Sequence, residues 1–381
     1  MNSFRIFVPF RPFVWIFFVL SYFFVFSYGN AATLFFYPQN IDLATGEEAL
    51  VDLRMDTGTD LINAVELEGS LSGVAATIRS MDNSGSALSI FVEQPELRGK
   101  SAFRLVGGSP AGLRGEFVLA RLVVRGEISG LSALSFNPES SRVLLADGIA
   151  SVAPLNVMNA QIQVIQKSAD YVPITSRSHP DQNQWYATDV ASFHIDLVPG
   201  TSYSYLISQD PLAFPDDVAD QPSGNLEWQG DTRLDGLTNG VYYVTVKKIG
   251  SSVVSRYRLM NDLTEPKWVE VQKNEGIGET EGRPFLTFLA QDQPSGVEYY
   301  EMRIDGQEAT TVASPQPLPD EYRALRLRAY DRAGNYIEKF IPGPTSDYWP
   351  WIWGAILLIL IIKASGILKK KKDMMDSFLT K

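Results

Sequence analysis

Short segments in which apolar and polar residues alternate recur along most of the chain, from residue 33 to residue 341. Residues 49–55, 117–124 and 322–330 are examples of such segments. A period of two places successive side chains on opposite faces of a β-strand, and regular short strands separated by turn residues are typical of β-sandwiches. With 381 residues, the chain is longer than one ordinary domain. The sequence therefore predicts an all-β protein with two or three sandwich domains.

The composition excludes several classes of function. The chain has no Cys, which rules out disulfides, zinc–thiolate sites and cysteine nucleophiles. Its two histidines, His179 and His194, are too few for a histidine-rich metal site, and a Ser-His-Asp site would have to use one of them. The formal net charge of -11 argues against nucleic acid as a partner, because phosphate binding needs clustered Lys and Arg.

The N-terminal segment has the pattern of a secretory signal peptide. Arg5 and Arg11 precede an apolar stretch over 13–26, and small or polar residues follow up to Ala32. A basic start, an apolar centre and a small-residue exit are the three parts of such a signal. We expect a signal helix over 1–31, with an uncleaved membrane anchor as the alternative.

The C-terminal segment has the pattern of a membrane anchor. An aromatic cluster at 348–353 leads into an apolar stretch, and four lysines, residues 369–372, close it. Aromatic residues favour the bilayer interface, and lysines favour its cytoplasmic side. We expect a transmembrane helix over 349–368 and a basic cytoplasmic tail over 369–381. This predicts a single-pass protein of the cell membrane, with the bulk of the chain outside the cell.

About a third of the chain resembles a cohesin domain. The resemblance covers residues 33–166 and rests on strand and turn motifs: Val51-Asp52-Leu53, Asp56-Thr57-Gly58, Ile62-Asn63-Ala64-Val65-Glu66, Phe91-Val92-Glu93-Gln94-Pro95, Phe103, Gly107-Gly108-Ser109-Pro110-Ala111-Gly112 and Val143-Leu144-Leu145-Ala146-Asp147-Gly148. Residues 69–73 depart from the aromatic-Asp-Pro turn that many cohesins have. The resemblance implies a nine-stranded jelly-roll sandwich, of the kind found in one group of carbohydrate-binding modules.

Two further modules resemble immunoglobulin-like folds. In residues 170–261, the run 237–242 is similar to the tyrosine corner of fibronectin type III domains, so we expect the Tyr242 hydroxyl to be buried and bonded to the backbone. Tyr243 then points to the opposite face of the strand. In residues 262–343, the joint 262–266 and the run 329–335 resemble bacterial immunoglobulin-like domains. Gly334 and Asn335 suit the positive φ of a hairpin turn.

No motif in the chain predicts a reaction. Asp292 and the pairs Asp216-Asp217 and Glu47-Glu48 are conceivable calcium ligands, but the chain has no calcium-loop motif, and turns are the usual place for Asp. Phosphate loops and dinucleotide fingerprints are also missing. Trp185, Trp228 and Trp268 could stack on sugars, but a core or domain-joint role is expected for at least two of them. We therefore predict no enzyme activity and no catalytic, cofactor or metal residues.

The predicted function is recognition. We expect a membrane-anchored, extracellular, non-catalytic binding or adhesion protein whose cohesin-like module binds a protein or a glycan. Residues 33–166 contain no Trp and only one Tyr, Tyr37, which favours a protein over a stacked sugar. The alternative is a cohesin scaffold that recruits dockerin-bearing enzymes for polysaccharide catabolism, and a hydrolase with an unrecognised site is a third, weaker hypothesis. The expected partners are the membrane and an extracellular protein, dockerin-like or other, or a glycan, but no nucleic acid.

Overall fold

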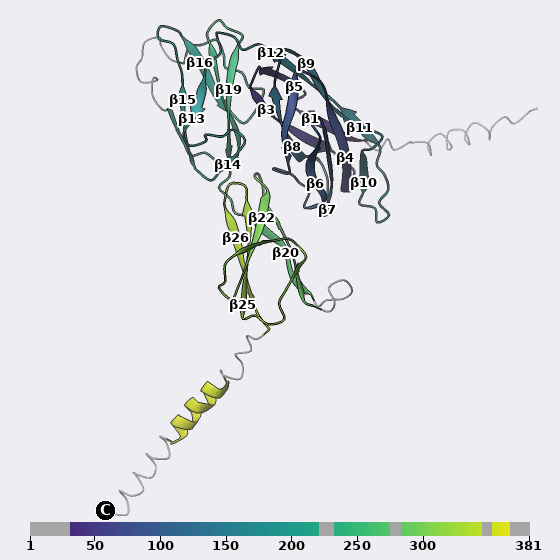
Figure 1. Cartoon of the computed structure of the whole chain (residues 1–381), viewed down its shortest axis with the longest axis vertical. Helices are drawn as coiled ribbons and strands as arrows, with labels where there is room; N and C mark the ends of the chain where they lie inside the picture. Colours follow the sequence, from purple (N-terminus) through teal and green to yellow (C-terminus); the bar gives the residue numbers. More distant parts are fainter. Residues whose placement is uncertain (1–30, 221–231, 275–282, 345–352, 366–381) are drawn as a thin grey trace, which may run out of the picture. The chain divides into compact units, whose positions relative to one another are not determined.

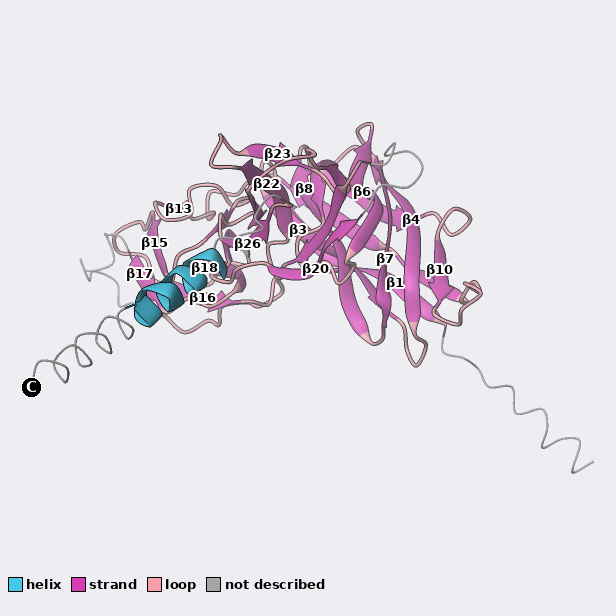
Figure 2. Cartoon of the chain, turned by 90° about the horizontal axis from the view of Figure 1, so that it is seen from below, coloured by secondary structure: helices cyan, strands magenta, loops and turns pink. Residues whose placement is uncertain are grey.

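The computed structural model describes residues 31–220, 232–274, 283–344 and 353–365. Within these ranges the chain consists of strands joined by loops, with one helix over 353–365 (Figures 1 and 2). The predicted all-β class is confirmed. The predicted signal peptide, apart from its last residue, and the predicted tail over 369–381 lie outside the described residues.

The prediction of a single-pass membrane protein is wrong. Across the described ranges, the structure contains no helix with the length and apolar character that a bilayer crossing requires. Of the expected span over 349–368, the structure describes the helix 353–365.

Two large sheets form the first sandwich. One has the strand order β11-β1-β3-β8-β5, and the other has the order β2-β12-β9-β4-β7-β6, with β10 also paired to β4 (Figure 1). Three short strands, β2, β10 and β11, are additional to the nine expected. The bounds are β1 Ala32–Tyr37, β2 Asn40–Ala44, β3 Glu48–Asp56, β4 Ile62–Gly73, β5 Ala76–Asp82, β6 Ile90–Arg98, β7 Ala102–Leu113, β8 Glu116–Gly126, β9 Gly130–Phe136, β10 Arg142–Leu145, β11 Leu155–Met158 and β12 Ala160–Ile165.

Aromatic rings fill the space between these two sheets. Phe36 of β1 stacks on Phe136 of β9 with ring centroids 4.2 Å apart, and it meets the edge of Phe103 of β7 at 6.2 Å. Gly69 of β4 makes room for this cluster, because a Cβ built there would lie 2.2 Å from the Phe103 ring and 2.7 Å from the Ser135 carbonyl oxygen. The close approach of β4 to its neighbours thus requires glycine at this position.

Residues 174–261 contain two smaller sheets, with strand orders β13-β15-β17 and β14-β19-β18-β16. The bounds are β13 Ile174–Ser176, β14 Trp185–Tyr186, β15 Val190–Ile195, β16 Tyr203–Ser208, β17 Thr232–Asp235, β18 Gly240–Lys248 and β19 Val254–Asn261. The Tyr242 hydroxyl contacts Thr238 as a tyrosine corner would, accepting from its backbone N–H at 3.3 Å and lying 2.7 Å from its side-chain oxygen. Tyr242 is only half-buried, however, whereas Tyr243 is buried.

Residues 267–342 form two further sheets, with strand orders β20-β21-β24 and β23-β22-β25-β26. The bounds are β20 Lys267–Asn274, β21 Phe285–Gln291, β22 Val297–Ile304, β23 Thr310–Val312, β24 Gln316–Pro317, β25 Ala324–Asp331 and β26 Tyr336–Pro342. The expected hairpin joins β25 to β26, with Tyr330 opposite Tyr336. Of its turn residues, Gly334 has a φ of 92°, whereas Asn335 is not at positive φ.

By their internal contacts, the residues divide into two compact units. The first comprises residues 1–174, 195–230 and 243–257, and the second comprises 175–194, 231–242 and 258–381. The first sandwich lies in the first unit, and the sheets formed by β20 to β26 lie in the second.

Candidate functional sites

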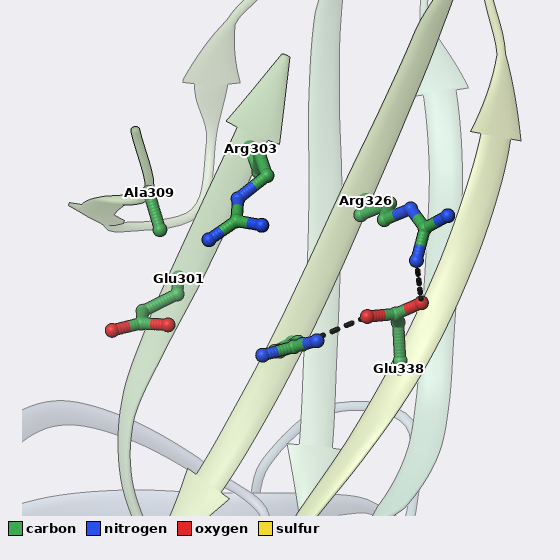
Figure 3. A pocket seen from close by; sticks show the side chains of 6 residues that line it. Glu301, Arg303, Ala309, Arg326 and Glu338 are labelled. Atoms are coloured by element: carbon green, nitrogen blue, oxygen red, sulfur yellow. Dashed lines mark hydrogen bonds and ion pairs between the residues drawn. The ribbon is translucent and has the colours of Figure 1, made fainter. Parts of the chain in front are cut away.

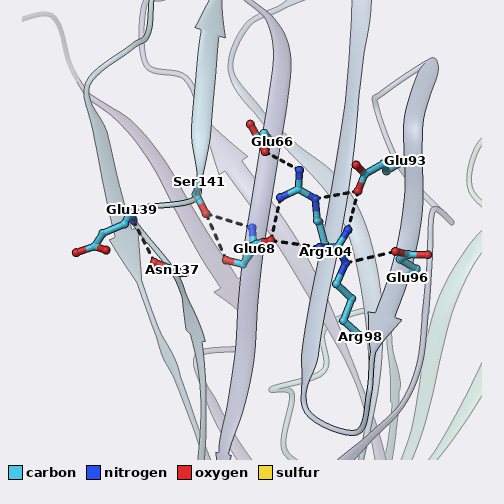
Figure 4. A network of polar contacts seen from close by, with 9 residues as sticks. All are labelled: Glu66, Glu68, Glu93, Glu96, Arg98, Arg104, Asn137, Glu139 and Ser141. Carbon is cyan, nitrogen blue, oxygen red and sulfur yellow. Dashed lines mark hydrogen bonds and ion pairs between the residues drawn. The ribbon is translucent and has the colours of Figure 1, made fainter.

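A charged surface covers the outer face of β4, β7 and β6 in the first sandwich. Alternation along β4 turns Val65 and Leu67 into the core and leaves Glu66 and Glu68 half-buried on the other face. Arg104 of β7 stands opposite Glu68 in the antiparallel register, so the two side chains share this face. Figure 4 shows how they meet.

Arg104 is the centre of this surface. Its guanidinium donates to Glu66 at 2.6 Å, to Glu68 at 2.9 Å and to Glu93 of β6 at 2.8 Å. All its donor nitrogens therefore point at carboxylates, and the planar group is held in one orientation.

Arg98 of β6 extends the surface. It donates to Glu93 at 3.0 Å and to Glu96 at 3.4 Å, and it lies 3.5 Å from Glu68. Because Glu68 and Glu93 also contact Arg104, the two arginines share two carboxylates. We call the six side chains the charged face: Glu66, Glu68, Glu93, Glu96, Arg98 and Arg104. Four carboxylates against two guanidiniums make this face acidic.

The electrostatics of the charged face follow from its geometry. The hydrogen bonds that Arg104 donates to Glu93, Glu66 and Glu68 raise its pKa above the ordinary value. Hydrogen bonds from Ser140 and Arg104 lower the pKa of Glu68. Surface ion pairs of this kind contribute little to stability. Their main effect is to fix where charge and hydrogen-bonding groups lie before a partner arrives.

A second cluster consists of three buried carboxylates. Asp262 follows β19, Asp292 follows β21, and Asp331 ends β25. They are 0%, 8% and 1% exposed, and one carboxylate oxygen of each lies within 4.8 Å of those of the others. The sequence motifs at 262–266 and 329–335 thus meet at one place, which their separation along the chain did not reveal.

Short loops hold these carboxylates. Asp262 accepts from the backbone N–H of Thr264 at 3.0 Å, and Asp292 accepts from that of Gly296 at 2.9 Å. Asn335 donates to Asp331 through its backbone at 2.8 Å. Burial, followed by the nearby charge of Asp262, raises the pKa of Asp292 to about 7. Burial is also the main cause of the raised pKa of Asp331.

This carboxylate cluster has the donor set of a hard divalent cation. Calcium prefers about six to eight oxygen ligands, which carboxylates and backbone carbonyls supply. Asp292 was one of the residues considered from the sequence, whereas Asp262 and Asp331 were not. In the part of the chain that the structure describes, neither the pair Asp216-Asp217 nor the pair Glu47-Glu48 belongs to such a group of three.

The two histidines occupy different surroundings. His179 is fully buried, and its Nδ1 lies 2.9 Å from the Ser178 hydroxyl. That hydroxyl also accepts from the backbone N–H of Ser192 at 2.8 Å, so it is part of a structural network. Burial lowers the pKa of His179 to about 4. His194 is exposed on β15.

Of the three tryptophans considered as sugar contacts, the two that the structure describes have core positions. Trp185 is buried, and Trp268 packs against the core of the sheets formed by β20 to β26. The expectation that at least two of the three tryptophans pack in cores is therefore confirmed. Trp228 lies outside the described residues.

Solved cohesin domains are similar in structure to about a third of the chain. A cohesin from Clostridium acetobutylicum is 13% identical, with a TM-score of 0.31 over 36% of this chain and 93% of its own. A non-cellulosomal cohesin from Archaeoglobus fulgidus is 13% identical, with a TM-score of 0.30 over 36% of this chain and 92% of its own. A type I cohesin–dockerin complex from Clostridium thermocellum is 13% identical, with a TM-score of 0.31 over 36% and 95%. No protein-family profile and no curated protein matches the chain.

Proposed function

We propose that the chain is a non-catalytic binding protein and that its cohesin-like module, residues 33–166, binds an extracellular protein. The observation that carries this proposal is the charged face, in which Arg104 and Arg98 hold four carboxylates in fixed positions on the outer face of one sheet. Electrostatic complementarity of this kind selects a partner and speeds its association. An acidic surface calls for a partner with a basic contact surface.

The composition of this face favours a protein over a stacked glycan. Strands β4, β6, β7 and β9 contain no Trp or Tyr. Their phenylalanines face the core: Phe103 and Phe136 are buried, and Phe91 packs against the core. A sugar-stacking surface needs exposed rings, and this face has none to offer.

The finer form of the proposal is a scaffold that recruits dockerin-bearing enzymes for polysaccharide catabolism. The sequence resemblance of residues 33–166 to cohesins supports it. In the same proposal, residues 170–261 act as a fibronectin-type spacer and residues 262–343 as an immunoglobulin-like spacer. Their two-sheet layouts and the Thr238–Tyr242 contact support these assignments.

A binding assay with matched arginine variants tests the proposal. The full chain is immobilised and exposed to a panel of purified dockerins and to a mixture of secreted proteins. Arg98→Glu reverses a charge on the charged face, and Arg79→Glu reverses one on β5 of the other sheet, with similar side-chain exposures of 47% and 53%. We expect Arg98→Glu to weaken partner binding, because it breaks the ion pairs that hold Glu68, Glu93 and Glu96 in place, and Arg79→Glu to leave binding unchanged. Equal effects of the two variants would contradict the proposed surface, and the absence of any dockerin partner would contradict the scaffold form.

A further inference from the structure

The outer face of the sheet β22-β25-β26 carries three cross-strand rows of side chains. The register places Tyr299, Tyr330 and Tyr336 in one row, Glu301, Arg328 and Glu338 in the next, and Arg303, Arg326 and Phe340 in the third. The inner face of the same strands packs Met302, Leu325 and Leu327 into the core. These nine outer residues form what we call the arginine–tyrosine face.

The tyrosine row is an ordered stack. The rings of Tyr299 and Tyr330 lie 4.8 Å apart and nearly parallel, and Tyr336 lies 5.2 Å from Tyr330. The Arg328 guanidinium lies 4.7 Å from the centre of the Tyr336 ring. Tyr336 and Phe340 nevertheless remain 43% and 57% exposed. The face therefore presents apolar ring surface at both ends of β26.

A hollow lies over the two charged rows. It is partly open to solvent and is lined by Glu301, Arg303, Ala309, Arg326, Arg328 and Glu338 (Figure 3). Glu338 accepts from Arg326 at 3.2 Å and from Arg328 at 2.8 Å, so this one carboxylate is shared by two arginines. The lining has three guanidiniums and two carboxylates, and is cationic in a chain whose net charge is -11.

Arg303 and Arg326 are a pair of neighbouring positive charges. They stand directly opposite each other on β22 and β25. Like charges in this position destabilise a sheet. Among the described residues, Arg326 has Glu338 as its ion-pair partner, whereas Arg303 has none. An anionic group held between the two guanidiniums would remove the repulsion and accept charge-assisted hydrogen bonds from both.

We propose that this hollow binds the carboxylate of a uronic acid residue in an acidic polysaccharide. The two arginines take the carboxylate, Glu301 accepts from neighbouring hydroxyls, and the exposed ring of Phe340, in the same row as the arginines, covers an apolar face of the sugar. An acidic peptide fits less well, because it offers carboxylates without a sugar face for the exposed Phe340 ring to cover. The site lies on a different module from the charged face, and it acts independently of the protein partner proposed above.

Binding of defined oligosaccharides to the full chain tests this inference. The probes are an oligomer of galacturonate, a galactose oligomer of the same length and a polyglutamate peptide. We expect the galacturonate oligomer to bind, more weakly at high ionic strength, and the other two probes to bind much less. Arg303→Ala removes one charge-assisted contact and should weaken galacturonate binding at least about tenfold. Arg79→Ala, which replaces an arginine on β5 of the first sandwich, is the matched control and should bind as the wild type does.

Stability measurements guard against a folding artefact. In the absence of any probe, Arg303→Ala relieves the repulsion of Arg326, so its melting temperature should equal or exceed that of the wild type. The inference is overturned if the galacturonate oligomer does not bind, if the neutral oligomer or the peptide binds equally well, or if Arg303→Ala binds galacturonate as tightly as Arg79→Ala does. A melting temperature for Arg303→Ala well below that of the wild type would show that Arg303 is structural and would also contradict it.

Discussion

Asp262 and Asp292 are joined by one residue between β21 and β22. The backbone N–H of Ser295 donates to Asp262 at 3.2 Å, and its hydroxyl donates to Asp292 at 3.1 Å. Asp331 completes the group from the end of β25. Burial, followed by the nearby charge of Asp262, raises the pKa of Asp292. A divalent cation would compensate the charge.

This geometry predicts that calcium stabilises the chain. Addition of calcium to chelator-treated protein should raise the melting temperature, because a ligand that binds only the folded state stabilises it. Asp292→Asn should abolish the calcium-dependent rise and should itself stabilise the chelated protein by removing a buried charge. Asp320→Asn, an exposed position in the same module, should retain the full calcium response. An unchanged response in Asp292→Asn would exclude this cluster as the calcium site.

The second prediction concerns acid sensitivity at His179. Burial lowers its pKa from 6.5 to about 4 in the folded state. Between these values the unfolded state binds more protons than the folded state, so stability falls as the pH falls from about 6.5 to about 4. The expected loss from this group is about 3 kcal/mol. Urea unfolding of wild type and His179→Gln across this pH range isolates the contribution of His179 to stability, with His194→Gln as the exposed control. Parallel pH profiles for wild type and His179→Gln would contradict the assignment.

Gly69→Ala should destabilise the first sandwich. The added methyl group meets the Phe103 ring and the Ser135 carbonyl at distances that real contacts do not reach. Overpacking of this kind costs about 1–3 kcal/mol. Chemical denaturation of the full chain measures the loss, and Phe103→Leu in the same chain should recover part of it by vacating space. Ser70→Ala, at the neighbouring position whose side chain points outward, is the control. If Gly69→Ala and Ser70→Ala unfold at the same denaturant concentration, β4 does not pack closely on the Phe103 ring.

Tyr242→Phe tests the contact typical of a tyrosine corner. The substitution leaves the Thr238 N–H without its hydroxyl acceptor, and because Tyr242 is half-buried we expect a modest loss of about 0.5–1.5 kcal/mol. Thr238→Val removes the side-chain half of the contact and should add little further loss in the Tyr242→Phe background. Thermal melts of the single and double variants measure the coupling. Fully additive losses would show that the two residues do not interact.

The strands were predictable from local alternation, whereas the sites depended on register. The pattern over residues 49–55 corresponds to β3, which runs from Glu48 to Asp56. The strand predicted over 322–330 begins two residues too early, because Tyr322 packs in the core before β25 starts at Ala324. The contact of Arg104 with Glu68 requires knowledge of which residues stand opposite each other, and alternation alone does not supply it.

The burial of Tyr243 shows a second limit of sequence reasoning. Alternation places Tyr242 and Tyr243 on opposite faces, but it does not say which face is covered. In the structure Tyr243 is 9% exposed and Tyr242 is the more exposed of the two. Packing partners far away in sequence decide this, just as they bring the joint at Asp262 and the hairpin at Asp331 together.

The most direct test of the proposed function is an amide hydrogen-exchange footprint of the full chain with and without its captured protein partner. The account predicts slower exchange on binding in β4, β6 and β7, whose outer side chains include Glu68, Glu93 and Arg104, and unchanged exchange in β1, β3 and β8 of the other sheet. The Arg98→Glu variant should lose this protection. Protection confined to β1, β3 and β8, or protection that survives Arg98→Glu unchanged, would contradict the account.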